Sequence, residues 1–309
     1  MFDFNDKVVL ITGASYGLGE YFAYGFAEAG ADLVLTARSE EALEAVGTKC
    51  REMGRKVSVV TGDVSIEAHV QRVIAQGLTD HKKIDVLINN AGIADTKGVV
   101  AEQFSAESFN QILAVDLAGA FYFARDCGKH MLERRSGSIV NICSILANGA
   151  NENSMIGYTA AKGGLRNLTL QLGVEWADRG VRVNSVSPGF IVTEMTRPML
   201  AAMGMDRWIA SRTPMRRVGE VDELTNSVMF LASDLASYIT GVDLQVDGGT
   251  NAGNGTFQIP PIHHEWNKDA PMVPTDYEAV ASRPDWYQAM EAGIPGLHYP
   301  VEDNEPAQE

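Results

Sequence analysis

Short runs of consecutive apolar and β-branched residues alternate with helix-period stretches over the first 250 residues. Strands that are covered on both faces read as continuous apolar runs, whereas half-exposed strands alternate apolar and polar positions. Helical patterns lie between the runs, for example over residues 40–53 and 66–79. Strands separated by helices predict an α/β fold with a doubly wound, parallel, seven-stranded sheet. The predicted strands cover residues 8–11, 32–36, 57–60, 84–88, 137–142, 181–186 and 242–246.

The pattern changes after Gly248 and Gly249. Residues 251–309 hold eight of the 11 prolines, six aromatic residues, and ten acidic against two basic residues. They show neither a helical nor a strand period over most of their length, yet they carry more aromatics than a solvated, disordered tail. We therefore predict one catalytic domain at residues 1–250 and an extended, Pro-rich, acidic C-terminal arm at residues 251–309. This arm is expected to pack on the body of the protein or on a neighbouring subunit.

The composition bounds the possible partners. The formal net charge is −15, and hydrophobic residues make up 45% of the chain. Nucleic acids and anionic membranes bind basic surfaces, so neither is expected as a partner. No apolar stretch approaches the roughly 20 residues that a membrane-spanning helix needs. No basic segment precedes the first predicted strand, and we therefore predict a globular protein of the cytoplasm.

The residues that commonly bind metals are arranged unfavourably for a metal site. Cys50, Cys127 and Cys143 are odd in number and widely spaced, which favours reduced, buried thiols over a disulfide framework or a zinc site. His263 and His264 are adjacent, and neighbouring side chains of an extended chain point to opposite sides. We expect no bound metal.

A glycine-rich segment follows the first predicted strand. It reads Thr12-Gly13-Ala14-Ser15-Tyr16-Gly17-Leu18-Gly19 and opens a helix expected to begin near Tyr16. Glycines allow a tight turn and a close approach of the backbone to a pyrophosphate, and the helix N-terminus supplies free N–H groups. The spacing departs from the G-x-G-x-x-G fingerprint, and a glycine-rich turn without a ligand is the alternative. The position between strand and helix favours a dinucleotide-binding loop formed by Gly13, Ser15, Tyr16, Gly17, Leu18 and Gly19.

The end of the second predicted strand indicates which dinucleotide is bound. An acidic residue there would bind the ribose 2′-hydroxyl of NAD, whereas an arginine accommodates the 2′-phosphate of NADP. The segment Leu35-Thr36-Ala37-Arg38 has no acid and one arginine. Arg38 could instead pair with Glu41 on the protein surface. We predict NADP as the cofactor, with NAD left open.

A tyrosine and a lysine lie four residues apart, at Tyr158 and Lys162, and so share one face of a predicted helix. A free tyrosine has a pKa of about 10, and a nearby cation stabilises a phenolate. Ser144 ends the preceding strand and could hydrogen-bond a substrate oxygen. A Tyr-x-x-x-Lys pair alone is more often an ordinary helix pair, so its context decides the interpretation.

The motifs together resemble the short-chain dehydrogenase/reductase family. They are Thr12-Gly13-x-x-x-Gly17-x-Gly19, Asn89-Asn90-Ala91-Gly92, Ser144, Tyr158-x-x-x-Lys162 and Pro188-Gly189, and the resemblance covers about residues 5–250 in matching order. It implies a Rossmann-like fold and an NAD(P)-dependent oxidoreductase acting on CH–OH and C=O groups.

The resemblance also implies roles for individual residues. Tyr158 would exchange a proton with the substrate oxygen, Ser144 would hold that oxygen, and Lys162 would bind the nicotinamide ribose and lower the pKa of the tyrosine. The remaining cofactor contacts would be Asp63 and Val64 at the adenine, the segment Asn89, Asn90, Ala91 and Gly92 beneath the nicotinamide side, and Pro188, Gly189, Ile191 and Thr193 at the carboxamide.

One position departs from the family pattern. Asp116 stands where the family usually has an asparagine, which supports a water that leads protons to the lysine. An aspartate adds a negative charge near Lys162 and lacks the amide donor. We include Asp116 in the catalytic set and expect an altered pH dependence; a helix-distorting residue with little catalytic effect is the alternative.

Residues 190–216 are predicted to form a lid over the substrate. The segment is rich in methionine, which adapts to irregular apolar shapes, although these residues could simply pack the lid on the body. It favours a fairly apolar, possibly cyclic ketone or secondary alcohol. The expected substrate contacts are Leu146, Asn153, Met195, Met199 and Trp208.

Three other functions stay open. A 3-oxoacyl carrier reductase would need a basic docking patch, for which Arg125, Lys129 and Arg166 are a thin candidate. A sugar-acid or polyol dehydrogenase would use the same chemistry. A non-catalytic nucleotide-binding sensor has only Asp116 in its favour. The resemblance further implies a homotetramer built on the helices over residues 109–134 and 158–177 and on the terminal strand, with the arm at an interface.

Overall fold

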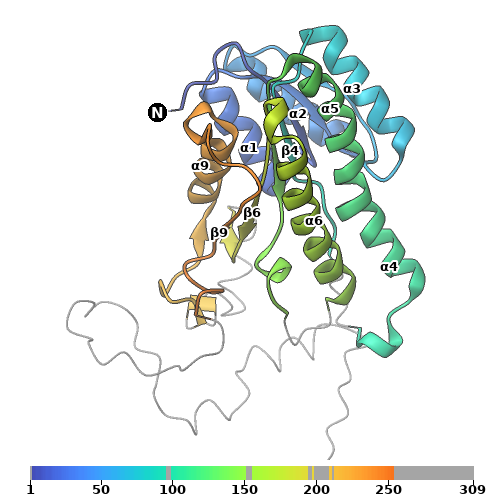
Figure 1. Cartoon of the computed structure of the whole chain (residues 1–309), viewed down its shortest axis with the longest axis vertical. Helices are drawn as coiled ribbons and strands as arrows, with labels where there is room; N and C mark the ends of the chain where they lie inside the picture. Colours follow the sequence, from blue (N-terminus) through green and yellow to red (C-terminus); the bar gives the residue numbers. More distant parts are fainter. Residues whose placement is uncertain are drawn as a thin grey trace, which may run out of the picture.

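A computed structural model describes residues 2–94, 99–150, 155–193, 197, 209–210 and 212–253. Its centre is a parallel seven-stranded sheet, as the sequence predicts, with the strand order β3-β2-β1-β4-β5-β6-β9 (Figure 1). The strands are β1 (Val8–Thr12), β2 (Asp32–Thr36), β3 (Val57–Val59), β4 (Val86–Asn89), β5 (Gly137–Ile142), β6 (Val181–Pro188) and β9 (Asp243–Val246).

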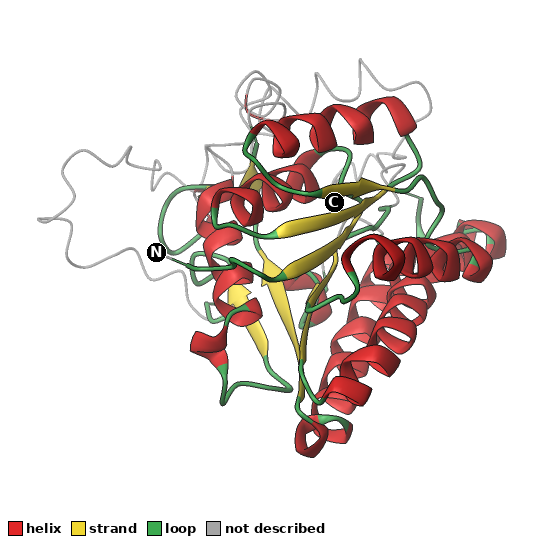
Figure 2. Cartoon of the chain, turned by 90° about the horizontal axis from the view of Figure 1, so that it is seen from above, coloured by secondary structure: helices red, strands yellow, loops and turns green. Residues whose placement is uncertain are grey.

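Helices cover both faces of this sheet (Figure 2). One face packs against α1 (Gly17–Glu28), α2 (Glu40–Glu52) and α9 (Val221–Ala232). The other packs against α3 (Glu67–His81), α5 (Ala120–Arg134) and α6 (Ile156–Glu175). A helical rod runs from α4 (Ala106–Leu113) through η2 (Ala114–Gly119) into α5 and lies beside α6 (Figure 1). Short 3₁₀ turns are η1 (Ala101–Gln103), η3 (Ile145–Ala147), η4 (Ala177–Arg179) and η5 (Asp234–Ala236).

Successive side chains of β1 point to opposite faces of the sheet, which explains why its first four residues are all apolar. Val9 and Ile11 join the core on the side of α1, where Phe22 is fully buried. Val8 and Leu10 join the core on the opposite side, against helices α3 and α5. Every residue of β1 is buried, as expected for a central strand of a sheet covered on both faces.

A buried polar chain connects the middle of the sheet to α6. The Asn89 amide nitrogen donates to the Asn141 side-chain oxygen at 2.9 Å, and the Asn141 amide nitrogen donates to the Thr169 hydroxyl at 2.8 Å. All three side chains are buried, and a buried amide is tolerated only when its hydrogen bonds are made. These bonds therefore set the position of α6, the helix that carries Tyr158 and Lys162, relative to β4 and β5.

Several elements begin or end one or two residues from their predicted bounds, and two further differences stand out. The fourth strand begins at Val86 instead of Ile84, because the Asp85 side chain accepts the backbone N–H of Val8 and bonds Arg134. A separate two-stranded sheet of β7 (Ile191–Val192) and β8 (Gly219–Glu220) was not predicted, since two residues are too few to show a period. Within the described residues, no helix has the length and apolarity that crossing a membrane requires.

Candidate active site

The site lies where the order of the strands reverses. The chain runs from β1 outward to β2 and β3 and then returns to β4 on the other side of β1. In open parallel sheets this reversal leaves a crevice at the carboxyl ends of the strands, where ligands bind. The glycine-rich segment follows β1, and Asn90 to Gly92 follow β4, so both reach this crevice.

Asn90 fastens these two segments together. Its side-chain amide donates to the carbonyl oxygens of Thr12 and Gly13, at 3.0 and 3.2 Å. In return, the Thr12 hydroxyl oxygen accepts the N–H groups of Asn90 and Ala91, both at 3.0 Å. The sequence predicted Asn90 as a cofactor contact but not this structural role, and it assigned no role to the Thr12 side chain.

The glycine-rich segment has the shape that a dinucleotide requires. A Cβ at Gly13 would lie 2.8 Å from Cα of Ala91, and one at Gly19 would lie 2.2 Å from the Gly13 carbonyl oxygen. At Gly17 a Cβ would meet open space, and glycine suits the positive φ of 57° there. No side chain caps the N-terminus of α1 at Tyr16, so its first N–H groups are available to a phosphate. These residues fit the pyrophosphate of a dinucleotide.

The end of β2 presents a basic side chain. Arg38 is exposed and makes no hydrogen bond or ion pair with any described residue, so the alternative ion pair with Glu41 is not formed there. Asp63 accepts hydrogen bonds from the N–H and the hydroxyl of Ser65, at 2.9 and 2.7 Å. Burial raises the pKa of Asp63, but these hydrogen bonds and the charge of Arg38 outweigh it and lower the pKa below its ordinary value. Val64 is buried beside Asp63.

Lys162 carries its ammonium group into the interior at the end of β5. The side chain is almost completely buried, with 4% of its surface exposed. Its Nζ donates to the Ile142 carbonyl oxygen at 3.0 Å and lies 5.4 Å from the centroid of the Tyr158 ring. A buried ammonium is stable only beside an opposite charge or several acceptors.

Asp116 supplies the opposite charge. Its side chain is fully buried, and Oδ2 lies 3.2 Å from Nζ of Lys162. That oxygen has no aligned hydrogen-bond donor among the described residues, so the contact is an ion pair. The other carboxylate oxygen, Oδ1, accepts the N–H of Ile93 at 2.8 Å. The residue lies in the π-helical turn η2, and such turns within α-helices are frequent at functional sites.

Burial and charge act against each other in this pair. Burial raises the pKa of Asp116, although the Lys162 ammonium and the Ile93 N–H oppose it. Burial lowers the pKa of Lys162, but the charges of Asp116 and Tyr158 outweigh it and raise the pKa above the ordinary value. The negative charge of Asp116 thus favours the protonated form of Lys162.

Gly92 lies directly beside this ion pair, at the edge of the crevice described above. A Cβ at position 92 would lie 2.8 Å from Oδ2 of Asp116 and 3.2 Å from Nζ of Lys162. Any side chain at this position would therefore displace one of the two charges. The sequence motif that contains Gly92 predicted its location, but not its contact with the ion pair.

Ser144 lies at the end of β5, on the turn that faces α6. It is the N-cap of η3, and its hydroxyl oxygen accepts the N–H of Leu146 at 3.2 Å. The turn packs on α6, so Ser144, Tyr158 and Lys162 come from two elements in direct contact. The neighbouring Cys143 is not a candidate nucleophile, because burial raises the pKa of its thiol to about 12.

The predicted carboxamide segment begins at the end of β6. Pro188 is buried there, and a Cβ at Gly189 would lie 2.8 Å from Cα of Asp247. Ile191 lies in β7, and Thr193 is buried just after it. The predicted substrate residues Asn153, Met195, Met199 and Trp208 lie outside the described residues.

A cleft of about 330 Å³ lies beside the predicted carboxamide segment, against β9 and the start of α9, and Ile191 is part of its lining. It is lined by residues such as Phe190, Met215 and Gly248, and by none of Ser144, Tyr158 or Lys162. The residues with the chemistry of an active site therefore lie outside this cleft.

The chain is similar in sequence to dehydrogenases and reductases of known function. The family model described as Enoyl-(Acyl carrier protein) reductase matches residues 13–251. The gluconate 5-dehydrogenase of Gluconobacter oxydans is 35% identical over 249 residues, which are 81% of this chain and 96% of that protein. The cis-4-hydroxycyclohexanecarboxylate dehydrogenase of Sinomonas cyclohexanicum is 35% identical over 251 residues, covering 81% and 98% of the two chains.

A solved structure supports the same assignment and the nature of the cofactor. The gluconate 5-dehydrogenase of Burkholderia cenocepacia, in complex with NADP and tartrate, superposes with a TM-score of 0.75 at 34% identity, covering 81% of this chain and 97% of that one. From the glycine-rich crevice to the buried lysine, the chain thus belongs to the short-chain dehydrogenase/reductase family, whose members are NAD(P)-dependent oxidoreductases acting on CH–OH and C=O groups.

Proposed function

We propose that the protein interconverts a fairly apolar, cyclic ketone and its secondary alcohol, with NADP(H) as cofactor and Tyr158 as the group that exchanges the proton. The observation that carries this proposal is the buried Lys162 ammonium, which is paired with Asp116 and lies 5.4 Å from the Tyr158 ring. An uncompensated ammonium would not be stable in this interior, and here it stabilises negative charge on the neighbouring phenol.

Each catalytic side chain has one task in the proposed reaction. During reduction, Tyr158 donates its hydroxyl proton to the carbonyl oxygen of the substrate, and during oxidation it accepts the proton of the alcohol. Lys162 stabilises the negative charge on the tyrosine after the proton has left. Ser144 donates a hydrogen bond to the same substrate oxygen. The nicotinamide, when bound, supplies or accepts the hydride.

The cofactor would be held along the crevice. The glycine-rich segment would bind the pyrophosphate, Arg38 the 2′-phosphate, and Asp63 and Val64 the adenine. Lys162 would also bind the nicotinamide ribose, and the carboxamide would meet the segment from Pro188 to Thr193. Arg38 favours NADP over NAD because it is exposed and has no bonded partner among the described residues.

The choice of substrate rests on the lid segment and on the named relatives. The methionine-rich segment at residues 190–216 favours an apolar substrate, and one relative is named for a cyclohexane carrying a hydroxyl group. A sugar acid is the second candidate, because two of the compared proteins are gluconate 5-dehydrogenases. A substrate attached to an acyl carrier protein is the third candidate, because the matching family model is described as an enoyl-(acyl carrier protein) reductase.

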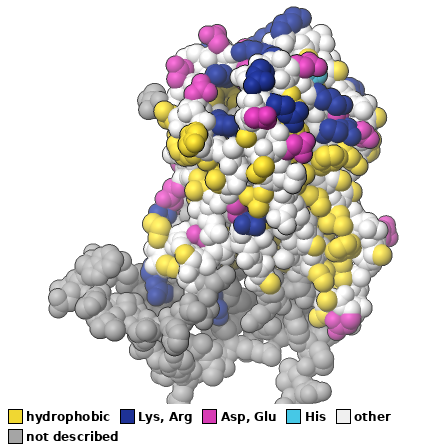
Figure 3. All heavy atoms as spheres, in the orientation of Figure 1, with side chains coloured by type: hydrophobic (Ala, Val, Ile, Leu, Met, Phe, Trp, Pro, Cys, Tyr) yellow, Lys and Arg dark blue, Asp and Glu magenta, His cyan; other side chains and the backbone are white. Residues whose placement is uncertain are grey.

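The proposal extends to the compartment and to the assembly. The three cysteines are all buried and free of disulfides, as is usual for proteins of the reducing cytoplasm. Hydrophobic side chains gather over the flank formed by α4 and α5 (Figure 3). Phe121 on α5 and Val174 on α6 are 38% and 77% exposed. A homotetramer built on these helices would cover both residues.

A substrate panel tests the proposed reaction. We expect the purified protein with NADPH to reduce cyclic apolar ketones with a kcat/KM at least about tenfold above that for keto sugar acids. Tyr158→Phe should lower kcat by about 10²–10⁴-fold, since a positioned acid contributes about that much. The control Tyr238→Phe alters a fully exposed tyrosine and should leave kcat unchanged. Preference for sugar acids would contradict the substrate class, and an active Tyr158→Phe would contradict the mechanism.

Replacing Arg38 tests the cofactor. Arg38→Ala should raise the KM for NADP⁺ by about 10- to 100-fold, because a charge-assisted hydrogen bond contributes about 1.5–3 kcal/mol. The KM for NAD⁺ should change less than about twofold, because NAD⁺ has no 2′-phosphate for Arg38 to bind. Initial rates with each cofactor give both values, and Arg179→Ala, at an arginine on η4 whose side chain is 42% exposed, is the control. Equal losses with both cofactors would rule out a 2′-phosphate contact.

Replacing Asp116 tests the ion pair. Asp116→Asn removes the negative charge that raises the pKa of Lys162 and leaves the burial that lowers it. The variant should therefore lose the ammonium at lower pH, and the alkaline limb of its kcat/KM profile should move to lower pH. Asp234→Asn, at a surface carboxylate with 88% of its side chain exposed, should leave the limb in place. A profile unchanged in Asp116→Asn would show that the carboxylate has no part in proton transfer.

A charged residue introduced on the exposed side of α5 tests the proposed tetramer. The native protein should have about four times the 33.4 kDa mass of the chain. Phe121→Asp should lower this mass, because moving a carboxylate from water into the proposed interface costs free energy. Sedimentation velocity measures both masses. Ile66→Asp, at an exposed position outside these helices, should leave the mass unchanged. A native monomer would refute the proposed tetramer.

A further inference from the structure

A second buried carboxylate lies on the other side of the Ser144 turn. Asp243 begins β9, and only 5% of its side-chain surface is exposed. Oδ1 accepts the hydroxyls of Ser185 and Ser187, at 2.7 and 2.8 Å, and Oδ2 accepts the Ser187 hydroxyl at 3.0 Å. Oδ2 also accepts the Asn148 amide at 2.6 Å. A carboxylate with this many donors is held in a single position.

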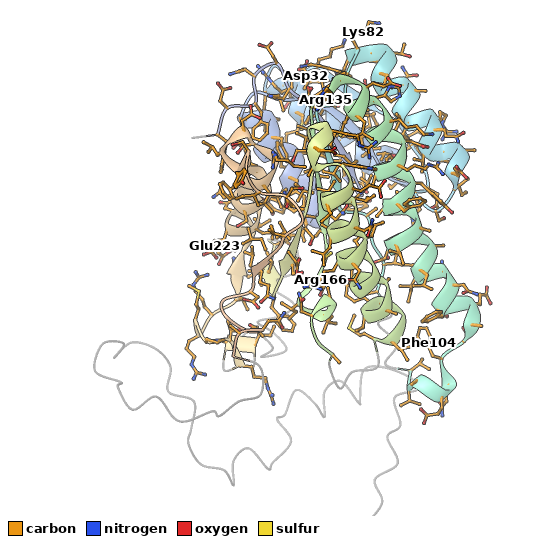
Figure 4. All side chains as sticks on the ribbon, in the orientation of Figure 1. Asp32, Lys82, Phe104, Arg135, Arg166 and Glu223 are labelled. Carbon is orange, nitrogen blue, oxygen red and sulfur yellow. The ribbon has the colours of Figure 1, made fainter. Side chains whose placement is uncertain are left out.

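The groups around Asp243 come from three different elements. Ser185 and Ser187 lie on β6, which pairs with β9 in register, Ser185 opposite Asp243. Asn148 directly follows η3. The Arg166 Nε lies 3.6 Å from Oδ2 of Asp243, and Arg166 extends from α6 at the level of η3 (Figure 4). A single carboxylate therefore ties the sheet, the turn after β5 and α6 together.

The tied turn is the one that carries Ser144. Its first residue is Ser144, and its end is held by the bond from Asn148 to Asp243. A second bond holds its middle, since the Asn251 amide donates to the Ile145 carbonyl at 3.1 Å. Asn251 is fixed in turn by Asp247, whose carboxylate accepts its N–H at 2.8 Å. The turn is thus held at two points, by the first residue of β9 and by the segment that follows β9.

We propose that Asp243 is a positioning residue for catalysis: it holds the Ser144 turn against α6, so that Ser144 and Tyr158 reach the same substrate oxygen. The inference rests on the role proposed above for Ser144. Asp243 touches neither reacting group, and a misplaced hydrogen-bond donor loses most of its effect on a transition state.

A double-mutant cycle separates positioning from general stability. Asp243→Asn keeps the size of the side chain but removes the charge that accepts hydrogen bonds from three side chains. We expect kcat to fall at least about tenfold while the Kd for NADPH, measured by fluorescence titration, changes less than about twofold. Ser144→Ala should lower kcat by itself, and adding Asp243→Asn to it should cause no further loss. Asp178→Asn, an exposed carboxylate, is the control.

The possible outcomes are distinct. Full additivity, in which Asp243→Asn lowers kcat equally with and without Ser144, would overturn the positioning role and leave the proposed function intact. An undiminished kcat in Ser144→Ala would contradict the role proposed for Ser144, and the role of Asp243 with it. If Asp243→Asn fails to fold, Asn148→Ala removes the tether at an exposed residue without disturbing the buried carboxylate. It should give the same non-additive cycle, and an unchanged kcat in Asn148→Ala would refute the inference.

Discussion

The interior position of the Lys162 ammonium is the constraint on which the site depends. A positive charge buried to this degree requires a partner, and the chain provides Asp116 at 3.2 Å and the Ile142 carbonyl at 3.0 Å. Ile142 ends β5, and the N–H of Ile93 that holds Asp116 lies just beyond β4. The charge therefore fixes how α6 and η2 meet the carboxyl edge of the sheet.

Helix α6 carries a second basic residue that lies close to a carboxylate of another element. Lys162 and Arg166 are four residues apart, and each faces a buried carboxylate, Asp116 and Asp243 respectively. One carboxylate comes from a π-helical turn and the other from the last strand of the sheet. Two ion pairs, one turn of the helix apart, thus connect α6 to two different elements, and the turn that carries Ser144 is bound to the carboxylate of the second.

The sequence predicted the features that depend on local pattern. Seven apolar runs became the seven strands because both faces of the sheet are covered, and the spacing of Tyr158 and Lys162 placed them on one helix face. The glycine-rich segment was likewise found from its position between a strand and a helix. Asp116 was predicted to bring a charge near Lys162, and the structure gives that charge a direct ion pair.

The contacts that sequence reasoning missed are made between distant segments. Nothing in the local pattern around Asn90 indicates that its amide binds the carbonyls of Thr12 and Gly13. The π-helical turn at η2 is also hidden, because an apolar helical period reads the same through an α-helix and a single wider turn. The three side chains that donate hydrogen bonds to Asp243 come from β6 and from the segment after η3, which only the folded sheet brings together.

The most direct test is the protonation state of Lys162 in the folded protein. It can be followed by NMR in protein carrying ¹³C-labelled lysine, with the Lys162 signal assigned by its absence from Lys162→Arg. Burial lowers the pKa of Lys162, but the surrounding charges, Asp116 first among them, together outweigh it, so the Lys162 ammonium should keep its proton to a higher pH than a lysine in an unfolded chain. Loss of that proton at a lower pH than in the unfolded chain would contradict an ion pair that keeps Lys162 charged.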